Sequence, residues 1–417
     1  MSRGLTDNIV PVPVDHHSVG HKLEIEILLQ SSRMGVSSKG EERIQRLLQQ
    51  GIDWDFLIRT ANYHRVLPLL YQTLCRIAPD SVPERTMSTL RSRFQANAQR
   101  NLFMSAELLQ VLDLLEKHHI RAIPYKGPVL SAALYGDVSL RQFSDLDIIV
   151  NASDVAQARA LLESRGYRPE KEVSSEELQI VIQNGKDLIL RRDNAITLEL
   201  HWGITADPDP IDIRPDFLWK NVGTLSLAGR IVNIHTPEDL LLILCVHGGK
   251  HRWEYLVWLC DVAELIRCYP GLNWKQVIET ASNLRARRIL LLGLLLARDA
   301  LDAELPEWVS RTIDGDHVVN ELGDQLKACL GGEVPLALQL GESQRYLVKL
   351  REHRSDRFLV ALKQVKHYLQ LTARDKEILP ESSPLLLYVV RPFRLVREYG
   401  LRPFRRFFKG LFESWRE

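Results

Sequence analysis

The most informative segment of the chain is Ser144-Asp145-Leu146-Asp147-Ile148-Ile149-Val150, in which two acids stand at alternate positions before a β-branched run. Residues two apart on a strand share a face, so Asp145 and Asp147 point the same way, about 7 Å apart at the backbone. The apolar residues on the other face anchor the strand. Carboxylates suit Mg²⁺, and bridging carboxylates can hold two ions about 3.5–4 Å apart. The segment therefore predicts a strand that presents metal-binding acids.

Pairs of aspartates with the same spacing occur at three other places, so the spacing alone is weak evidence for a site. Asp53 and Asp55 begin a predicted helix, where acids complement the helix dipole. The pairs at 207–209 and 314–316 lie among prolines and in a predicted turn. Only the pair at 145–147 leads into a β-branched run, although a purely structural role is the alternative for any isolated pair.

A second strand with a polar face is expected at residues 195–202, where apolar and polar residues alternate. Glu199 and His201 lie on the polar face. If this strand lies beside the first, Glu199 completes a cluster of three carboxylates. Such a cluster repels itself unless cations are bound, which favours a metal site. A solvated strand face explains the pattern equally well.

The centre of the chain is expected to form a small mixed sheet with helices on one side. Strand and helix patterns alternate between residues 122 and 166, and two further strands follow at 188–192 and 195–202. The polar pair Asp193-Asn194 between them suits a hairpin turn. Strands mixed with packed helices predict an α+β fold.

Helical periodicity dominates on both sides of this sheet, and the last helix before it is expected at residues 101–119. The chain is therefore divided into five expected segments: a loose arm (1–20), an N-terminal helical region (21–119), the sheet core (120–235), a C-terminal helical region (236–390) and a basic aromatic tail (391–417).

Bulk composition favours an ordinary globular protein of the cytoplasm. The 417 residues include 54 Lys and Arg against 53 Asp and Glu, so no global field favours a nucleic acid or an anionic membrane. Five cysteines are scattered without C-x-x-C pairs, which suits a reducing compartment. The N-terminus does not resemble a secretory signal, and no apolar run reaches the roughly 20 residues that a membrane-spanning helix needs.

Taken together, the motifs between about Asp53 and Ile266 resemble the uncharacterised nucleotidyltransferases of the DNA polymerase beta superfamily, which are related in their core to the aminoglycoside nucleotidyltransferases. The resemblance is carried by several motifs in order: Asp53-Trp54-Asp55-Phe56-Leu57, Tyr63-His64-Arg65-Val66, Pro124-Tyr125-Lys126-Gly127-Pro128, Leu134-Tyr135-Gly136-Asp137, Arg141-Gln142-Phe143-Ser144-Asp145-Leu146-Asp147, Leu198-Glu199-Leu200-His201-Trp202, and residues 247–261.

This resemblance implies specific roles for the central motifs. Asp145 and Asp147 would bind both Mg²⁺ or Mn²⁺ ions, Glu199 would be the third acid, and Lys126-Gly127 would begin the nucleotide-binding turn. His201, on the face of Glu199, is assigned to the nucleotide as well.

One departure from the superfamily concerns the phosphate contacts. The usual Gly-Ser ahead of the acids is Gly127-Pro128 here, and the interval to Asp145 is longer than usual. Lys126 and Arg141 are the nearest cations that could neutralise a triphosphate, Arg141 with bidentate geometry. Simple surface solubility is the alternative role for both.

A further candidate is His247-Gly248-Gly249-Lys250-His251-Arg252. Two glycines before a helix start would expose backbone N–H groups that cradle an anion beside Lys250. A plain helix break is one alternative. Zinc on His247 and His251 is a weaker one, because no third ligand is evident.

The tail at 391–417 carries eight basic residues against three acids, with five interleaved phenylalanines. Such a stretch can lie on an anionic membrane, hold a nucleic acid or dock on a partner protein. A terminal helix that packs its Phe side on the body is slightly favoured.

The expected function is metal-dependent transfer of a nucleoside monophosphate from a nucleoside triphosphate, by default ATP, with release of pyrophosphate. The acceptor, whether a small molecule, a sugar, a peptide, a protein or an RNA end, is not indicated. Two alternatives stay open: a nucleotide-binding regulator without turnover, and an interaction protein recruited by its basic tail.

Overall fold

The computed structural model describes residues 21–330 and 340–369, except 194–195, 206–210, 212 and 214. The expected arm at 1–20 and the basic tail at 391–417 lie outside the described residues, as does part of the expected hairpin turn at Asp193-Asn194. The boundaries of the five expected segments stay predictions.

The centre of the fold is a five-stranded mixed sheet, which confirms the predicted α+β class. Its strands lie in the order β1 (Ala122–Pro124), β2 (Asp145–Val150), β5 (Ile196–His201), β4 (Asp187–Arg192) and β3 (Arg168–Pro169). The β2–β5 pair is parallel and all other neighbours are antiparallel. The two strands singled out from the sequence are therefore direct neighbours.

The alternation of the two central strands is visible in their burial. Leu146, Ile148 and Val150 are fully buried on one face of β2, as the sequence predicts. Ile149, on the face of the acids, is buried as well, so this end of β2 is covered on both sides. In β5 the apolar residues are buried and Glu199 is only half-buried. Within β2, the start of the strand at Asp145 is thus more open than the rest.

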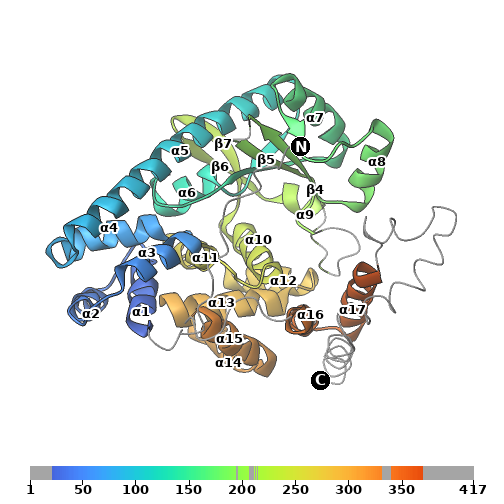
Figure 1. Cartoon of the computed structure of the whole chain (residues 1–417). Coiled ribbons are helices and arrows are strands. Elements are labelled where there is room, and N and C mark those ends of the chain that lie inside the picture. The colour runs from blue at the N-terminus through green and yellow to red at the C-terminus, as the bar shows by residue number, and fades with distance from the viewer. Residues whose placement is uncertain are drawn as a thin grey trace, which may run out of the picture.

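Helices cover this sheet and connect it to the rest of the chain. They are α5 (Glu84–Lys117), α6 (Pro128–Tyr135), α7 (Val155–Ser164) with the short 3-10 turn η3 (Ala152–Asp154), and α8 (Ser175–Asn184). The long α5 reaches from the N-terminal helices to the far side of the sheet (Figure 1). It begins well before the expected start at residue 101. A second, two-stranded sheet of β6 (Val222–Leu227) and β7 (Arg230–His235) was not predicted.

In the part of the chain that the structure describes, four α-helices precede α5, and the signal at Asp53 correctly marks the start of one of them. They are α1 (Lys22–Ser31), α2 (Ser38–Leu48), α3 (Trp54–Tyr63) and α4 (Leu67–Ile77), followed by the 3-10 turn η2 (Pro79–Ser81). The Asp53 side chain accepts a hydrogen bond from the Phe56 N–H at 2.8 Å, which caps α3. This acid pair therefore serves a helix start, as expected.

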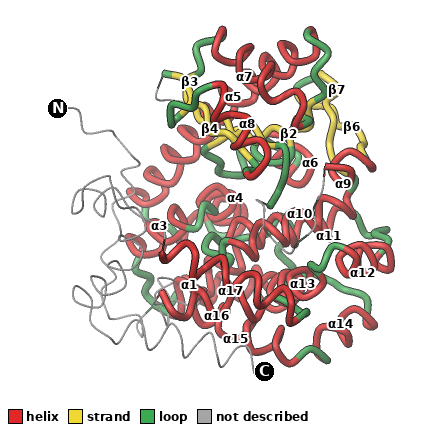
Figure 2. The backbone as a smooth tube through the Cα atoms, turned by 90° about the vertical axis from the view of Figure 1, so that its right-hand side faces the viewer, coloured by secondary structure: helices red, strands yellow, loops and turns green. Residues whose placement is uncertain are grey.

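The C-terminal helices pack around α13. In order they are α9 (Pro215–Lys220), α10 (Pro237–Lys250), α11 (Leu256–Cys268), α12 (Trp274–Asn283), α13 (Arg287–Leu301), α14 (Glu307–Asp314), α15 (His317–Leu330), α16 (Leu340–Lys349) and α17 (Arg354–Leu369). Residues 289–297 of α13 are buried on every side, and α13 contacts α10, α11 and α15. Strands gather at one end of the molecule, and the helices from α10 onward lie toward the other (Figure 2).

A continuous apolar core joins the sheet to both helical regions. Within the described residues, none of the helices combines the length and the apolar character that crossing a bilayer requires.

Candidate active site

The parallel pairing of β2 with β5 brings the predicted acids together. Asp147 lies opposite Glu199 in the register, and Asp145 lies opposite Thr197. Glu199 therefore lies beside Asp147. The sequence predicted this arrangement only if the two strands were neighbours. Asp147 is 2% exposed, whereas Glu199 and Asp145 are half-buried.

Asp147 is bound through one carboxylate oxygen only. Its Oδ1 accepts a hydrogen bond from Lys126 Nζ at 2.9 Å and lies 3.1 Å from His201 Nε2. Its Oδ2 is buried and has no hydrogen-bond partner among the described residues. Burial opposes the charge on Asp147, but Lys126 and His201 outweigh burial and hold the pKa of Asp147 well below its ordinary value. The carboxylate is therefore charged and half-unsatisfied.

The tightest cluster of ligand atoms consists of Asp147, Glu199 and His201, with one atom from each lying within 4.8 Å of the others. His201 Nε2 is 3.2 Å from Glu199 Oε2 and 3.3 Å from the Tyr125 hydroxyl. Burial alone would lower the pKa of His201, but hydrogen bonds to Asp147 and Glu199 raise it. The sequence placed His201 with the nucleotide, and the structure places it against two acids.

Asp145 stands outside this tight cluster but shares its electrostatics. Burial, followed by the charge of Asp147, raises the pKa of Asp145 to about 6. Glu199 adds to the rise, and Lys126 opposes it. The three carboxylates repel one another when they are ionised, and a bound divalent cation would relieve that repulsion.

The donor set fits a hard divalent cation. The buried Asp147 Oδ2 without a protein partner supplies one oxygen ligand, and the carboxylates of Glu199 and Asp145 can supply others. His201 adds a nitrogen beside them, which Mn²⁺ tolerates better than Mg²⁺ does.

Lys126-Gly127 forms the turn between β1 and α6, next to β2. Gly127 has a positive φ of 58°, and a Cβ there would lie 3.2 Å from the Asp145 carbonyl oxygen. The turn therefore requires glycine. Pro128 takes the first position of α6, where a missing N–H costs nothing. The turn therefore accommodates Gly127-Pro128 at the place where the superfamily usually has Gly-Ser.

Arg141 lies in a buried ion pair, away from the expected phosphate role. Its Nε and one terminal nitrogen each donate to the Asp261 carboxylate at 2.8 Å, and the side chain is 5% exposed. The Tyr135 hydroxyl also donates to Asp261, at 2.9 Å. The sequence could not indicate this partner because Asp261 lies on α11, far along the chain.

The predicted anion cradle at Gly248-Gly249 is wrong, because both glycines lie inside α10 rather than before a helix. A Cβ on Gly248 would come 2.3 Å from the Trp253 ring, and one on Gly249 would come 2.8 Å from Ile289. The glycines therefore permit close packing. The segment is the C-terminal end of a helix, which carries the negative end of the dipole and disfavours anions.

The remaining residues of that motif line the region near the sheet. Lys250 Nζ donates to the Ile204 carbonyl at 2.9 Å, just after β5. The rings of His247 and His251 lie 4.8 Å apart. Among the described residues neither histidine belongs to a cluster of three metal-ligating side chains, so zinc gains no support.

Sequence reasoning missed Arg100 on α5, which donates to the carbonyls of Phe143 and Ser144 just before β2. Nothing in the local pattern distinguishes it from other helix-surface arginines.

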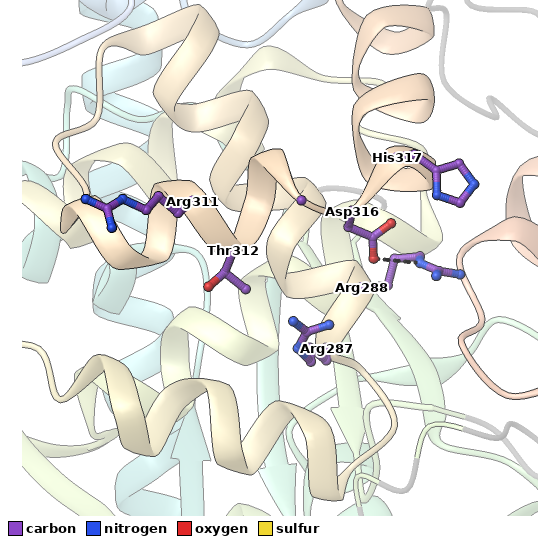
Figure 3. A pocket seen from close by; sticks show the side chains of 7 residues that line it. Arg287, Arg288, Arg311, Thr312, Asp316 and His317 are labelled. Carbon is purple, nitrogen blue, oxygen red and sulfur yellow. Dashed lines mark hydrogen bonds and ion pairs between the residues drawn. The ribbon is translucent and has the colours of Figure 1, made fainter.

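A separate cavity of about 410 Å³ lies between α13, α14 and α15, and its lining includes Arg287, Arg288 and Arg311 (Figure 3). Each arginine has an acidic neighbour: Arg288 contacts Asp316 at 3.3 Å, and Arg287 contacts Glu352 at 3.4 Å. Arg311 pairs with Glu307. These acids balance the positive charge of the lining locally.

A family model described as "Uncharacterised nucleotidyltransferase" matches residues 50–302. The match spans the N-terminal helices from α3, the whole sheet and the helices through α13. Comparison with curated proteins finds no match.

Three solved structures show a distant likeness. The solution structure of the antibiotic-resistance factor ANT(2'')-Ia is 13% identical, with a TM-score of 0.33, covering 45% of this chain and 94% of that one. A crystal structure of ANT(2")-Ia in complex with adenylyl-2"-tobramycin is 15% identical, with a TM-score of 0.30 over 44% and 98%. An antigenic nucleotidyltransferase-like protein from Paracoccidioides brasiliensis is 18% identical, with a TM-score of 0.27 over 49% and 93%.

Proposed function

The chain belongs to the family of uncharacterised nucleotidyltransferases, and from this membership we propose that it transfers a nucleoside monophosphate from a nucleoside triphosphate at the acids of β2 and β5. The observation that carries the proposal is the Asp147 carboxylate, which is buried and charged and has one oxygen without a hydrogen-bond partner in the described part of the chain. A carboxylate that is costly to bury and is left unsatisfied indicates a site kept for a ligand.

Asp145, Asp147 and Glu199 would hold divalent metal, with two Mg²⁺ ions, or Mn²⁺, as the proposed complement. When bound, the cations lower the pKa of the acceptor group and neutralise charge on the phosphates. His201 orients Asp147 and Glu199 through the contacts at 3.1 and 3.2 Å. It acts as a positioning residue for the two carboxylates.

Lys126 has two proposed tasks on the donor side. It fixes Asp147 through the bond to Oδ1, and its charge faces the region where the triphosphate would lie beside the Gly127 turn. Lys250 is proposed to approach the triphosphate from the end of α10. Arg141 has no place in this scheme, because Asp261 occupies its guanidinium.

The reaction proposed is in-line displacement at the α-phosphorus. An acceptor oxygen or nitrogen forms the new bond to phosphorus and loses its proton, while the bond to the bridging oxygen breaks and pyrophosphate leaves. ATP is the proposed donor on abundance alone. The acceptor is left as a nucleophile of unspecified class.

The test offers each α-labelled nucleoside triphosphate to the protein, with Mg²⁺ or Mn²⁺ and a cell extract as the source of acceptors. The intact protein should transfer label and release pyrophosphate, and Asp147→Asn should do neither. Asp239→Asn is the matched control, since Asp239 is an equally buried aspartate on α10 whose carboxylate accepts from Asn221.

Equal transfer by the intact protein and Asp147→Asn would refute the site. Nucleotide binding without pyrophosphate release, with any acceptor supplied, would instead favour the nonenzymatic regulator. Loss of localisation on deleting residues 391–417, with the central domain still folded, would favour the recruited interaction protein.

A further inference from the structure

Arg65 occupies an unusual backbone position at the end of α3. Its φ is 60°, and the helix closes with hydrogen bonds from Arg65 N to Asn62 O and from Val66 N to Ala61 O. Glycine is the common residue at this left-handed position. The chain reverses here into α4, so the position fixes the direction in which Arg65 leaves the backbone.

The Arg65 side chain is held in place by the start of α11. Its guanidinium carbon lies 4.5 Å from the centre of the Tyr255 ring, within the range of a cation–π contact. The same junction is fixed by two hydrogen bonds to His64, from Leu256 N at 3.3 Å and Val257 N at 3.2 Å. Arg65 is half-buried, and these contacts hold its guanidinium in one position.

Within the described part of the chain, no carboxylate lies within ion-pair distance of the Arg65 guanidinium. Arg285 shows the contrast, because it ends α12 with the same hydrogen-bond pattern and a φ of 56°. Arg285 pairs with the buried Asp356 at 2.6 Å. Two arginines in one backbone setting thus differ in whether the protein supplies the counter-charge.

Two other cations at the sheet site have acidic partners. Lys126 pairs with Asp147, and Lys186 pairs with Asp187, which lies opposite His201 in the register of β4 and β5.

Packed rings connect Arg65 to the edge of the sheet site: the Tyr255 ring lies 5.0 Å from that of Trp258, which lies 5.0 Å from that of His247 on α10. Lys250, at the end of α10, donates to the Ile204 carbonyl just after β5. Arg65 is thus a cation without an acidic partner among the described residues, at the helix junction that packs beside the sheet site.

The charge and the geometry suit a phosphate. A guanidinium offers a planar fork of donors that matches phosphate oxygens, and a half-buried cation gains most from an anion that arrives with its ligand. The acids proposed to bind metal repel a triphosphate, so a nearby cation offsets that repulsion.

We propose that Arg65, held against Tyr255, is a phosphate-binding residue of the donor site that the N-terminal helical region contributes to the sheet. This inference rests on the proposed nucleotidyl transfer at Asp147. It makes the region before the sheet part of the nucleotide site rather than an appendage to it.

The experiment measures binding of ATP and of tripolyphosphate, each with Mg²⁺, to the intact protein and to Arg65→Gln by calorimetry. Arg65→Gln should bind both about 10–100-fold more weakly, as expected for losing a charge-assisted pair. Arg65→Lys should recover part of the loss, since it keeps the charge without the fork. Arg285→Gln, the matched control, should bind as the intact protein does.

Arg65→Gly separates binding from folding. Glycine relieves the left-handed backbone, so this variant should keep its melting temperature and still bind tripolyphosphate as weakly as Arg65→Gln. In turnover, the loss should appear in the KM for the nucleotide more than in kcat. The response of the melting temperature to Mg²⁺ alone should stay that of the intact protein.

Two outcomes overturn the proposal in different ways. If the intact protein binds both ligands and Arg65→Gln binds them equally well, the Arg65 assignment is wrong and the Asp147 site survives. If the intact protein binds neither ligand with Mg²⁺ or Mn²⁺, the donor site itself fails and the inference fails with it.

Discussion

Asp147 and Asp261 are both buried aspartates facing a buried cation, but the protein completes the shell of only one of them. Asp261, 1% exposed, receives two hydrogen bonds from Arg141 and one from Tyr135, so both of its oxygens are engaged. Asp147 has Lys126 and His201 on Oδ1, and its Oδ2 has no hydrogen-bond partner among the residues that the structure describes. The residue types of the two pairs are nearly the same, but the hydrogen bonding of the two carboxylates differs.

The difference separates a structural ion pair from a site. A satisfied buried pair fixes two elements, here the approach to β2 and α11, and offers nothing to a ligand. An unsatisfied buried charge costs stability, which proteins tolerate at functional positions. The number of free oxygens, rather than burial or charge, tells the two apart.

The largest effect is expected at Asp147. Asp147→Asn should reduce nucleotidyl transfer at least about a thousand-fold, equivalent to about 4 kcal/mol, because it removes a metal-binding charge. The melting temperature should fall modestly, because the lowered pKa of Asp147 means that its charge stabilises the fold and Lys126 loses its partner, while relief of repulsion from the neighbouring acids offsets part of the cost. Activity and calorimetric unfolding on the same preparation check both parts, and a fall in melting temperature without loss of activity would place Asp147 with the structural pairs.

Asp261→Asn should show the opposite pattern. It leaves the buried Arg141 without a charged partner, which should destabilise the fold by about 3 kcal/mol. Activity per folded molecule should stay close to that of the intact protein below the unfolding transition. Denaturant titration measures the loss, and an unchanged midpoint would mean that the pair contributes no stability.

Divalent metal should stabilise only through the unsatisfied cluster. At a hundred-fold excess over its Kd, Mg²⁺ should add about 2.7 kcal/mol to the intact protein and nothing to Asp147→Asn. Chelator should reverse the gain. Because the pKa of Asp145 is about 6, a proton competes with the metal below that pH, and affinity should fall about tenfold per pH unit there. A shift of equal size in both proteins would argue for another metal site.

The smallest effect concerns the third bond to Asp261. Tyr135→Phe removes a hydroxyl that donates at 2.9 Å and should cost about 1.5 kcal/mol, the value for a hydrogen bond to a charged group. Transfer activity and the Mg²⁺ response should be unaffected. A cost as large as that of Asp261→Asn would mean that Arg141 alone does not hold the carboxylate.

Strand periodicity was enough to predict β2, β5 and the shared face of Glu199 and His201, because alternation is a local property of the backbone. The sequence left open whether the two strands are neighbours, and the observed register answers that question. It also could not tell Arg141 from Lys126, since the distinction depends on Asp261, which approaches from α11.

The error at Gly248-Gly249 has the same physical origin. Two glycines beside a lysine suggest an anion loop, but the space they leave is filled by Trp253 and Ile289. Close packing between helices and a phosphate-binding turn both favour glycine. Only the residues that surround a glycine in the fold show which of the two roles it has. The two-stranded sheet of β6 and β7 went unpredicted.

The parallel pairing of β2 with β5 also sets when the cluster can exist during folding. Asp147 and His201 are 54 residues apart along the chain, and the loop between them must close before they meet. Closing so long a loop carries an entropic cost that local contacts do not offset, so such pairings form late. A growing polypeptide that ends before β5 lacks Glu199 and His201, so binding of metal at the proposed site would report that β5 has joined the sheet.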